Sequence, residues 1–300
     1  MQALWMIAAS FVFASMGVCI KFASLYFNNA EMVFYRGVVG MIFMAIWARA
    51  SGTSLRTRML PMHAWRSAIG VMSLSAWFYA ITHLPLATAM TLNYMSSVWI
   101  AAFLVGGSLM FAKPGQKIPS QGPLVLTILA SFAGVVMLLR PAIDQNQALA
   151  GLVGLLSGLG AAFAYMQVIA ISRAGEPDIR TVFYFAAGTA LAGGAGMAVV
   201  GTSAWDWQHA LWLPPLGILA SLGQLCMTKA YTMSKNHGGT LMVANLQYSG
   251  IVFAAFFSLV LFGDVIPLLG WAGMALIVSS AIAATVLRAR AAPDAPAEEH

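Results

Sequence analysis

Apolar blocks close to 20 residues long run along the whole chain, and short gaps between them hold most of the charged residues. An α-helix of about 20 residues spans the roughly 30 Å hydrocarbon core of a bilayer. The blocks therefore predict membrane-spanning helices and not the core of a soluble domain. Ten spans are expected, at residues 3–24, 32–48, 65–82, 86–111, 122–139, 150–171, 181–201, 211–230, 238–262 and 267–287.

The composition agrees with this pattern. Of the 300 residues, 60% are hydrophobic and 8% are charged, whereas soluble domains carry about 25% charged residues. The segment Met1 to Ala23 lacks a basic leading region and is followed by further spans, so we interpret it as the first helix and not as a signal peptide. Residues 289–300 are rich in Pro, Ala and acids and are expected to form a disordered cytoplasmic tail.

The net charge of +6 is better explained by membrane orientation than by nucleic-acid binding. With the N-terminus in the cytoplasm, one set of alternate loops holds Arg49, Arg56, Arg58, Arg66, Lys113, Lys117, Arg173, Arg180, Lys235, Arg288 and Arg290. The other set carries mainly acids, namely Glu31, Asp144, Asp206 and Asp264. Because basic loops stay in the cytoplasm, we expect a multi-pass protein of the bacterial inner membrane with both termini inside.

Short matches recur at an offset of about 150 residues. The segment starting at Phe13 parallels the one starting at Phe163, Phe34-Tyr35 parallels Phe183-Tyr184, and the segment starting at Asn93 parallels the one starting at Asn245. An odd number of spans per half would insert the halves in opposite orientations, as in many transporters. The predicted fold is therefore an all-α integral membrane protein whose ten transmembrane helices form two inverted five-helix repeats, residues 1–145 and 146–288.

Several segments resemble the drug/metabolite transporter superfamily, in particular its ten-helix branch built from two EamA-type repeats. The resemblance is carried by Phe34-Tyr35-Arg36-Gly37, by the run from Tyr79 to Ala87, and by Phe262-Gly263-Asp264 before the last span. It covers residues 3 to 287, but the first half reads Phe111-Ala112-Lys113 where the family has its glycine-acid pair. The resemblance implies a transporter, and its length and aromatic content are most similar to exporters of amino acids and related metabolites.

Polar side chains at membrane depth usually face the interior of a helix bundle, because an unsatisfied polar group in lipid is costly. Asn93 with Ser97, and Asn245 with Ser249, are spaced four residues apart, which places each pair on one helix face. These four residues are candidate substrate-binding groups, and their recurrence in both halves favours that role. The alternative is that the amides only join neighbouring helices through hydrogen bonds.

Aromatic residues inside the spans are further candidates, because a ring with one hydroxyl suits the apolar side chain and polar head of an amino acid. The candidates are Trp77, Tyr79, Tyr94, Trp99, Tyr165 and Tyr248, and Gln224 joins them as an in-span polar residue. Ordinary packing or an interfacial aromatic belt is the alternative for each ring.

Few cations fall within the predicted spans. Arg36 lies about one turn inside the second span and Lys21 lies near the outer end of the first. Each could attract a carboxylate, but we favour snorkelling of both side chains to the outer surface. With so few buried charges, neutral and especially aromatic amino acids are the expected substrates.

Acids are absent from the middle of every predicted span, so proton coupling through a buried carboxylate is not predicted. Two alternatives remain for the energy source. One is facilitated diffusion, and the other is coupling through an acid at a helix end or through His83. We assign His83 to a short outer loop.

Other classes of protein lack their sequence signatures. No HExxH, GxSxG or GxxxxGK[ST] segment occurs, and Cys19 and Cys226 lie inside spans, so no enzyme, ATP-driven pump, cofactor or metal site is expected. A facilitator of another metabolite or drug, a channel and a lipid flippase stay as alternatives. The expected partners are a small-molecule substrate and membrane lipid, without nucleic acid. The sequence leaves the coupling ion and the oligomeric state open, with a monomer among the options.

Overall fold

The computed structural model describes residues 1–99, 102–103, 122–144, 147–233, 243 and 246–291. Asn245, the Phe111-Ala112-Lys113 segment and the C-terminal tail lie outside the described residues. The helices are α1 (Gln2–Ala23), α2 (Asn29–Ala50), α3 (Leu60–His83), α4 (Leu86–Tyr94), α6 (Gly122–Asp144), α7 (Ala148–Arg173), α8 (Asp178–Val200), α9 (Trp207–Ala210), α10 (Leu213–Thr232), α12 (Ser249–Phe262) and α13 (Leu268–Ala291).

The all-helical expectation is confirmed for the described part of the chain, and most helices begin and end within a few residues of the predicted spans. Among the described residues, five segments are long and apolar enough to cross a membrane, namely α1, α2, α7, α8 and Trp207–Thr232. One difference bears on the site: α3 begins at Leu60 and not near residue 65. Pro61 fits in the first turn because its missing N–H would have no partner there in any case. As a result Arg66 lies inside the helix. His83 is likewise the last residue of α3 and not a loop residue.

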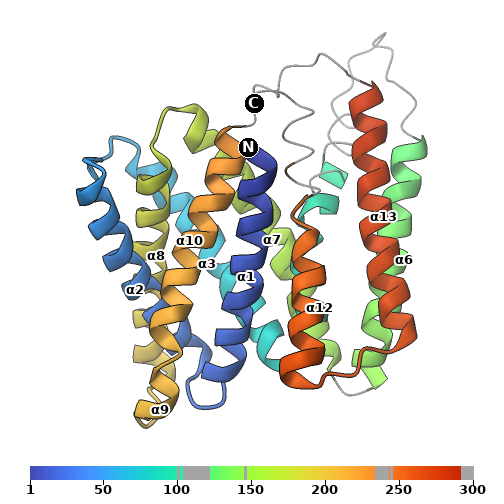
Figure 1. Cartoon of the computed structure of the whole chain (residues 1–300), viewed down its shortest axis with the longest axis horizontal. Coiled ribbons are helices and arrows are strands. Elements are labelled where there is room, and N and C mark those ends of the chain that lie inside the picture. The colour runs from blue at the N-terminus through green and yellow to red at the C-terminus, as the bar shows by residue number, and fades with distance from the viewer. Residues whose placement is uncertain (100–101, 104–121, 145–146, 234–242, 244–245, 292–300) are drawn as a thin grey trace.

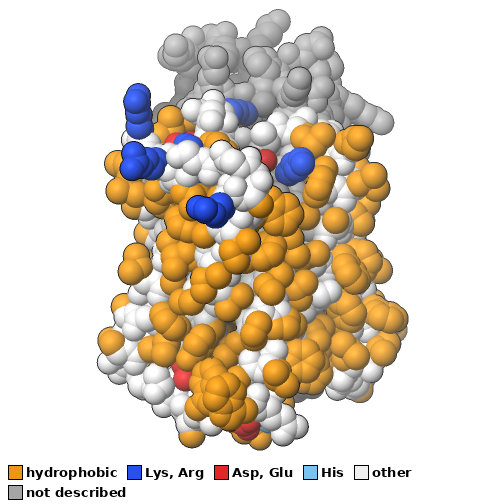
Figure 2. Space-filling model, turned by 60° about the vertical axis from the view of Figure 1, so that its left-hand side comes forward, with side chains coloured by type: hydrophobic (Ala, Val, Ile, Leu, Met, Phe, Trp, Pro, Cys, Tyr) orange, Lys and Arg blue, Asp and Glu red, His pale blue; other side chains and the backbone are white. Residues whose placement is uncertain are grey.

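The long helices run side by side, and α1 begins at the same end of the bundle at which α13 ends (Figure 1). We call this the basic end, because the connections there carry Arg56 and Arg58 between α2 and α3, and Arg173 at the end of α7. The Lys and Arg side chains visible in Figure 2 gather near that end, above a broad hydrophobic band. On α12, Val252, Phe256 and Val260 are more than half exposed, as expected for a face in contact with lipid.

The helix contacts follow a regular pattern across the two halves of the chain. α2 packs along α8 and α6 packs along α13, while α1 packs along α10 as α3 packs along α7. Similarly, α1 contacts α12 as α7 contacts α4. The main contacts are therefore reproduced when each helix of the first half is exchanged for its counterpart in the second. The helices α1, α2, α3, α4 and α6 then correspond to α7, α8, α10, α12 and α13.

Glycines let two helix backbones touch where α2 crosses α8. A methyl group on Gly37 would collide with the backbone nitrogen of Ala190, and one on Gly193 would collide with that of Phe34. This close packing is the role expected of small residues at membrane helix contacts.

Two helices are interrupted in the interior of the bundle. α4 ends at Tyr94, the chain turns at Met95, and helical residues resume at Ser96. A turn at Gln247 and Tyr248 comes before α12 in the same way. Gly158 of α7 packs on the first interruption, where an added methyl group would lie 2.5 Å from the carbonyl oxygen of Leu92. The first interruption places irregular backbone next to the interior cavity that Asn93 and Tyr94 line.

Candidate functional site

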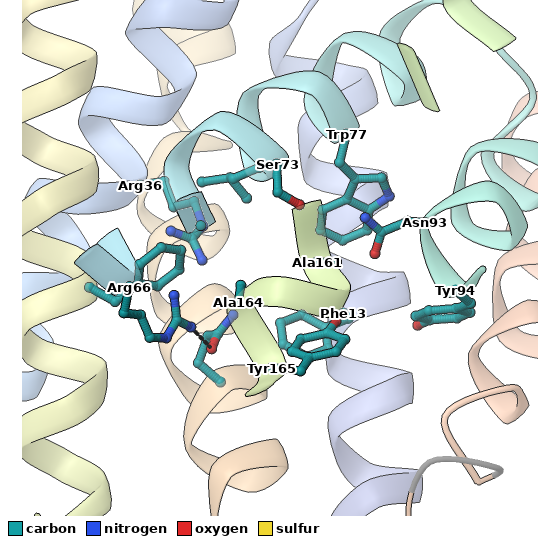
Figure 3. A pocket seen from close by; sticks show the side chains of 14 residues that line it. Phe13, Arg36, Arg66, Ser73, Trp77, Asn93, Tyr94, Ala161, Ala164 and Tyr165 are labelled. Carbon is teal, nitrogen blue, oxygen red and sulfur yellow. Dashed lines mark hydrogen bonds between the residues drawn. The ribbon is translucent and has the colours of Figure 1, made fainter. Parts of the chain in front are cut away.

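A cavity lies between helices from both halves of the chain (Figure 3). The lining side chains come from α1, α2, α3, α4, α7, α8 and α10. Of the residues expected to bind substrate, the lining includes Trp77, Asn93, Tyr94, Tyr165 and Gln224. The cavity volume is about 50 Å³. This conformation therefore has room for a few waters, and a metabolite needs the cavity to widen.

Two arginines from different helices reach one aromatic ring in this cavity. Arg36 of α2 and Arg66 of α3 have their Cζ atoms 5.2 and 4.0 Å from the ring centre of Phe185 in α8. Both residues are only 3% exposed. Gly70 makes space for the second guanidinium, because a methyl group there would lie 2.5 Å from Arg66 Nη1.

The two guanidinium groups are incompletely satisfied. Arg66 Nη2 donates a hydrogen bond to Gln224 Oε1 at 3.3 Å. Arg66 Nε, Arg66 Nη1 and Arg36 Nε have no hydrogen-bond partner among the described residues. No Asp or Glu among the described residues forms an ion pair with either arginine.

These positions correct two expectations. Snorkelling of Arg36 to the surface and the placement of Arg66 in a cytoplasmic loop are both wrong, since both residues are buried at the cavity. The early start of α3 accounts for Arg66. Arg36 is buried because the rotation of α2 turns its side chain toward Phe185 and away from lipid.

The cavity region around Asn93 holds a hydrogen-bond network that joins three helices. Asn93 Nδ2 donates to Ser157 Oγ at 3.1 Å, and Ser157 Oγ donates in turn to the carbonyl oxygen of Gly154. Ser73 Oγ of α3 donates to the Ser157 carbonyl oxygen at 2.8 Å. Asn93 thus lines the cavity and also joins α4 to α7, so both interpretations of this amide have a structural counterpart.

Aromatic side chains occupy the same region, away from the arginines (Figure 3). Trp77 and Tyr94 are buried, and Trp77 Nε1 and the Tyr94 hydroxyl lack hydrogen-bond partners among the described residues. Tyr165 accepts a hydrogen bond from Gln247 Nε2 at 3.1 Å. The cavity therefore combines a cationic part with an aromatic part that still has hydrogen-bonding groups to offer.

The remaining predicted site residues lie outside this lining. Tyr79 stacks on His83 at the end of α3, and Trp99 packs against Phe103 and Phe132. Ser249 donates to a backbone carbonyl in its own segment. Ser97 and Tyr248 are also absent from the lining, although Tyr248 is buried.

One buried carboxylate at the basic end has several partners. Glu176, between α7 and α8, accepts hydrogen bonds from Thr57 Oγ1 at 2.6 Å and from Arg180 Nη1 at 2.8 Å. His63 Nε2 lies 3.7 Å from the same carboxylate. Arg180 also donates to the carbonyl oxygen of Ser54. These contacts fasten the α2–α3 connection to the α7–α8 connection.

The opposite end has its own paired charges. Lys21 Nζ lies 3.0 Å from Asp264 Oδ2, which also accepts a hydrogen bond from Ser258 Oγ at 2.6 Å. Glu31 accepts hydrogen bonds from the backbone nitrogen and the hydroxyl of Ser203. Contacts between distant parts of the chain thus hold this end together.

Reasoning from the sequence missed several residues that line the cavity or bond to its lining. Arg66 and Phe185 were not proposed, and neither were Ser73, Ser157 and Gln247. For Gln247 a signal exists, because it is a polar residue inside the repeated segment that begins at Asn245. Ser157 lies in the small-residue stretch of α7 and gives no comparable sign of its contact with Asn93.

Comparison with known proteins identifies relatives along almost the whole chain. No protein-family model matches. The pseudopaline exporter CntI of Pseudomonas aeruginosa is 32% identical over 280 residues, covering 92% of this chain and 93% of the exporter. An uncharacterized transporter of Helicobacter pylori is 25% identical and the alignment covers 91% of each protein. A riboflavin transporter of Brucella anthropi is 22% identical, covering 92% of this chain and 95% of the other.

The fold also recurs in a solved structure. A crystal structure of another protein matches with a TM-score of 0.63 at 20% identity, over 95% of this chain and 98% of that one. At this identity the likeness shows the fold alone. The curated relatives above are named as transporters and not as enzymes. From its identity to CntI, the chain belongs to the same family of multi-pass membrane transporters of small metabolites as the pseudopaline exporter.

Proposed function

We propose that the chain is a secondary transporter of the drug/metabolite transporter superfamily that exports small amino-acid-type metabolites by alternating access. The observation that carries this proposal is the interior cavity shared by both halves. Arg36 and Asn93 reach it from the first half, and Tyr165 and Gln224 reach it from the second. A site between two related halves can open to either side of the membrane as the halves move against each other.

Two features support inverted repeats at residues 1–145 and 146–288. The helix contacts of one half recur in the other, and helices are interrupted at Met95 and at Gln247–Tyr248, which belong to the repeated segments. Interrupted helices beside a central site are typical of such transporters. The narrow cavity is what an occluded conformation would have.

The distribution of cations supports cytoplasmic termini. Arg49, Arg56, Arg58 and Arg173 lie at or near the basic end, and basic connections favour the cytoplasm. A reporter fused after Thr57 should therefore be cytoplasmic, and one fused after Ser203 should be outside. The reverse result would overturn this topology in the inner membrane.

Amino-acid-type substrates fit the side chains of the cavity. A guanidinium binds a carboxylate through two hydrogen bonds, and the Asn93 amide lies near the rings of Trp77 and Tyr94 (Figure 3). These rings suit an apolar or aromatic portion of the same molecule. Export, as opposed to uptake, is supported by the name of the Pseudomonas relative.

Counterflow of radiolabelled metabolites in proteoliposomes tests the proposal. We expect saturable flux of amino acids or related compounds, and reduced flux in Asn93→Ala with folded protein retained. A hydrogen bond lost in the site costs roughly 1–3 kcal/mol. Ser15→Ala is the control, because it removes only a bond to the carbonyl oxygen of Phe11 in the same helix.

Other outcomes would redirect the assignment. Single-channel conductance in place of saturable flux would identify a channel, and lipid scrambling in vesicles would identify a flippase. Absence of flux for every metabolite in the panel would overturn the proposed function.

A further inference from the structure

We propose that the transported molecule carries two anionic groups, foremost two carboxylates, which bind Arg36 and Arg66 together. The proposal rests on the proposed transport function and specifies the substrate class of the same cavity. Both arginines line the cavity and are 3% exposed, and both guanidinium groups lie over the one ring of Phe185. The pair therefore forms one cationic subsite built from two helices.

The subsite is incomplete without an anion. Two like charges repel each other, and each loses its hydration on burial, so buried charges in proteins are normally paired with an opposite charge. The ring of Phe185 offers a cation–π contact to each, but such contacts compensate only part of the loss. Elsewhere in the described chain, Glu176 is paired with Arg180 and Lys21 with Asp264.

The free donors indicate how the anions bind. Arg66 has Nε and Nη1 without partners, and Arg36 has Nε without one. A guanidinium presents such N–H groups in a planar fork that fits both oxygens of a carboxylate or a phosphate. One carboxylate balances one guanidinium, so two positive groups call for two negative groups on the substrate.

The part of the cavity away from the arginines indicates the chemistry of the rest of the substrate. Trp77 and Tyr94 line this part of the cavity, and Trp77 Nε1 and the Tyr94 hydroxyl are buried without a hydrogen-bond partner among the described residues. In Figure 3 these two rings lie on the side of the cavity away from Arg36 and Arg66. The structure therefore favours an elongated molecule with a dianionic head and an apolar portion that carries hydrogen-bond acceptors.

The test uses the full-length protein in proteoliposomes and three matched sets of probes. The first set is phenylalanine amide, phenylalanine and N-succinylphenylalanine, which share one aromatic side chain and carry zero, one and two carboxylates. The second is glutamine and glutamate. The third, tyrosine and O-phosphotyrosine, distinguishes a phosphate from a second carboxylate. We expect the dicarboxylate of each of the first two sets to compete for flux at least tenfold better than its monocarboxylate.

Four cavity variants and one control identify the residues responsible. Arg36→Gln and Arg66→Gln should each remove the preference for dicarboxylates, while Arg36→Lys and Arg66→Lys should keep part of it. Arg49→Gln changes an exposed arginine on α2 and should behave like the wild type.

Thermal unfolding without substrate supplies a second readout. An arginine with a structural role would lower the unfolding temperature when replaced. Removal of one of two uncompensated buried charges should leave the temperature unchanged or raise it. N-succinylphenylalanine should stabilise the wild type and not the Gln variants, because only a ligand that binds the folded state shifts its stability.

The outcomes separate the two proposals. Equal competition by mono- and dicarboxylates, or a preference that survives both Gln substitutions, would overturn the dianion and leave the transport function standing. A preference for O-phosphotyrosine without one for dicarboxylates would assign the pair to phosphate and overturn the dicarboxylate. If no probe and no amino acid were transported, the proposed transport function itself would be overturned.

Discussion

The two buried arginines of the cavity differ from the ion-paired residues at the two ends of the bundle. At the ends, Glu176 meets Arg180 at 2.8 Å and Lys21 meets Asp264 at 3.0 Å. In the cavity, Arg36 and Arg66 share an aromatic ring and have no acid partner among the described residues. The paired charges hold connections together, whereas the unpaired charges are available to a ligand.

The strongest way to break this contrast is to give the cavity an acid of its own. Gln224→Glu would place a carboxylate oxygen near Arg66 Nη2, which now lies 3.3 Å from Gln224 Oε1. A charged hydrogen bond contributes about 1.5–3 kcal/mol, so we expect dicarboxylate flux to fall by about a hundredfold. The thermal stability of the empty protein should rise.

Flux and unfolding temperature of Gln224→Glu are compared with those of Gln208→Glu. Gln208 is exposed on α9, away from the cavity, and its substitution should change neither quantity by much. Undiminished flux in Gln224→Glu would show that Arg66 does not bind the substrate.

At the basic end the effect should fall on stability. Glu176→Gln removes the charge that pairs with Arg180 and His63, on a side chain only 5% exposed. We expect a loss of about 2 kcal/mol in the free energy of unfolding, measured by denaturant or thermal unfolding in detergent. The dicarboxylate preference should persist, and its disappearance would contradict the division of roles.

A smaller effect is expected at the opposite end. The side chains of Lys21 and Asp264 are 16% and 19% exposed, so solvent screens their attraction. Lys21→Met should cost about 1 kcal/mol of stability or less, and the difference from wild type should shrink as salt is added. A loss that is unaffected by salt would point to packing against Phe262, over whose ring Lys21 Nζ lies at 4.6 Å.

The smallest effect should be a change in the pH dependence of stability at acidic pH. Burial alone would raise the pKa of Glu176, but hydrogen bonds from Thr57 and Arg180 and the nearby charges of Arg180 and His63 lower it below its ordinary value of 4.5. A carboxyl whose pKa is lowered on folding stabilises the protein fully above the unfolded value, and this stabilisation is lost as the pH falls through the folded value.

The unfolding temperature of the wild type should thus fall more steeply below pH 4.5 than that of Glu176→Gln. Scans from pH 7 to pH 3 on both proteins measure the difference. Parallel curves would mean that the carboxylate is not stabilised by its partners.

The positions of helices along the chain could be predicted, because the bilayer fixes their length. α2 and α8 begin and end within three residues of the expected spans. The expected candidates Trp77, Asn93, Tyr94, Tyr165 and Gln224 do line one cavity. Their part in binding stays a prediction.

The rotation of each helix could not be predicted in the same way. A membrane helix is apolar on the face toward lipid and also on the face toward its neighbours, so the hydrophobic pattern does not identify the inner face. Arg36 and Arg66 were therefore assigned to the surface by their nearness to span ends. Pairs such as Lys21 with Asp264, which are 243 residues apart, depend on the tertiary packing of both halves.

In the proposed transport cycle, the two arginines would also make the empty site responsive to voltage. An elementary charge that crosses the whole membrane potential gains or loses about 2.3 kcal/mol per 100 mV. A negative cell interior would hold an empty, positively charged site toward the cytoplasm, where metabolites await export. A substrate with two carboxylates would cancel that charge, so the loaded site of the proposed cycle would turn outward without working against the potential. Buried guanidinium groups that have no acid partner would in this way bias the direction in which the transporter waits.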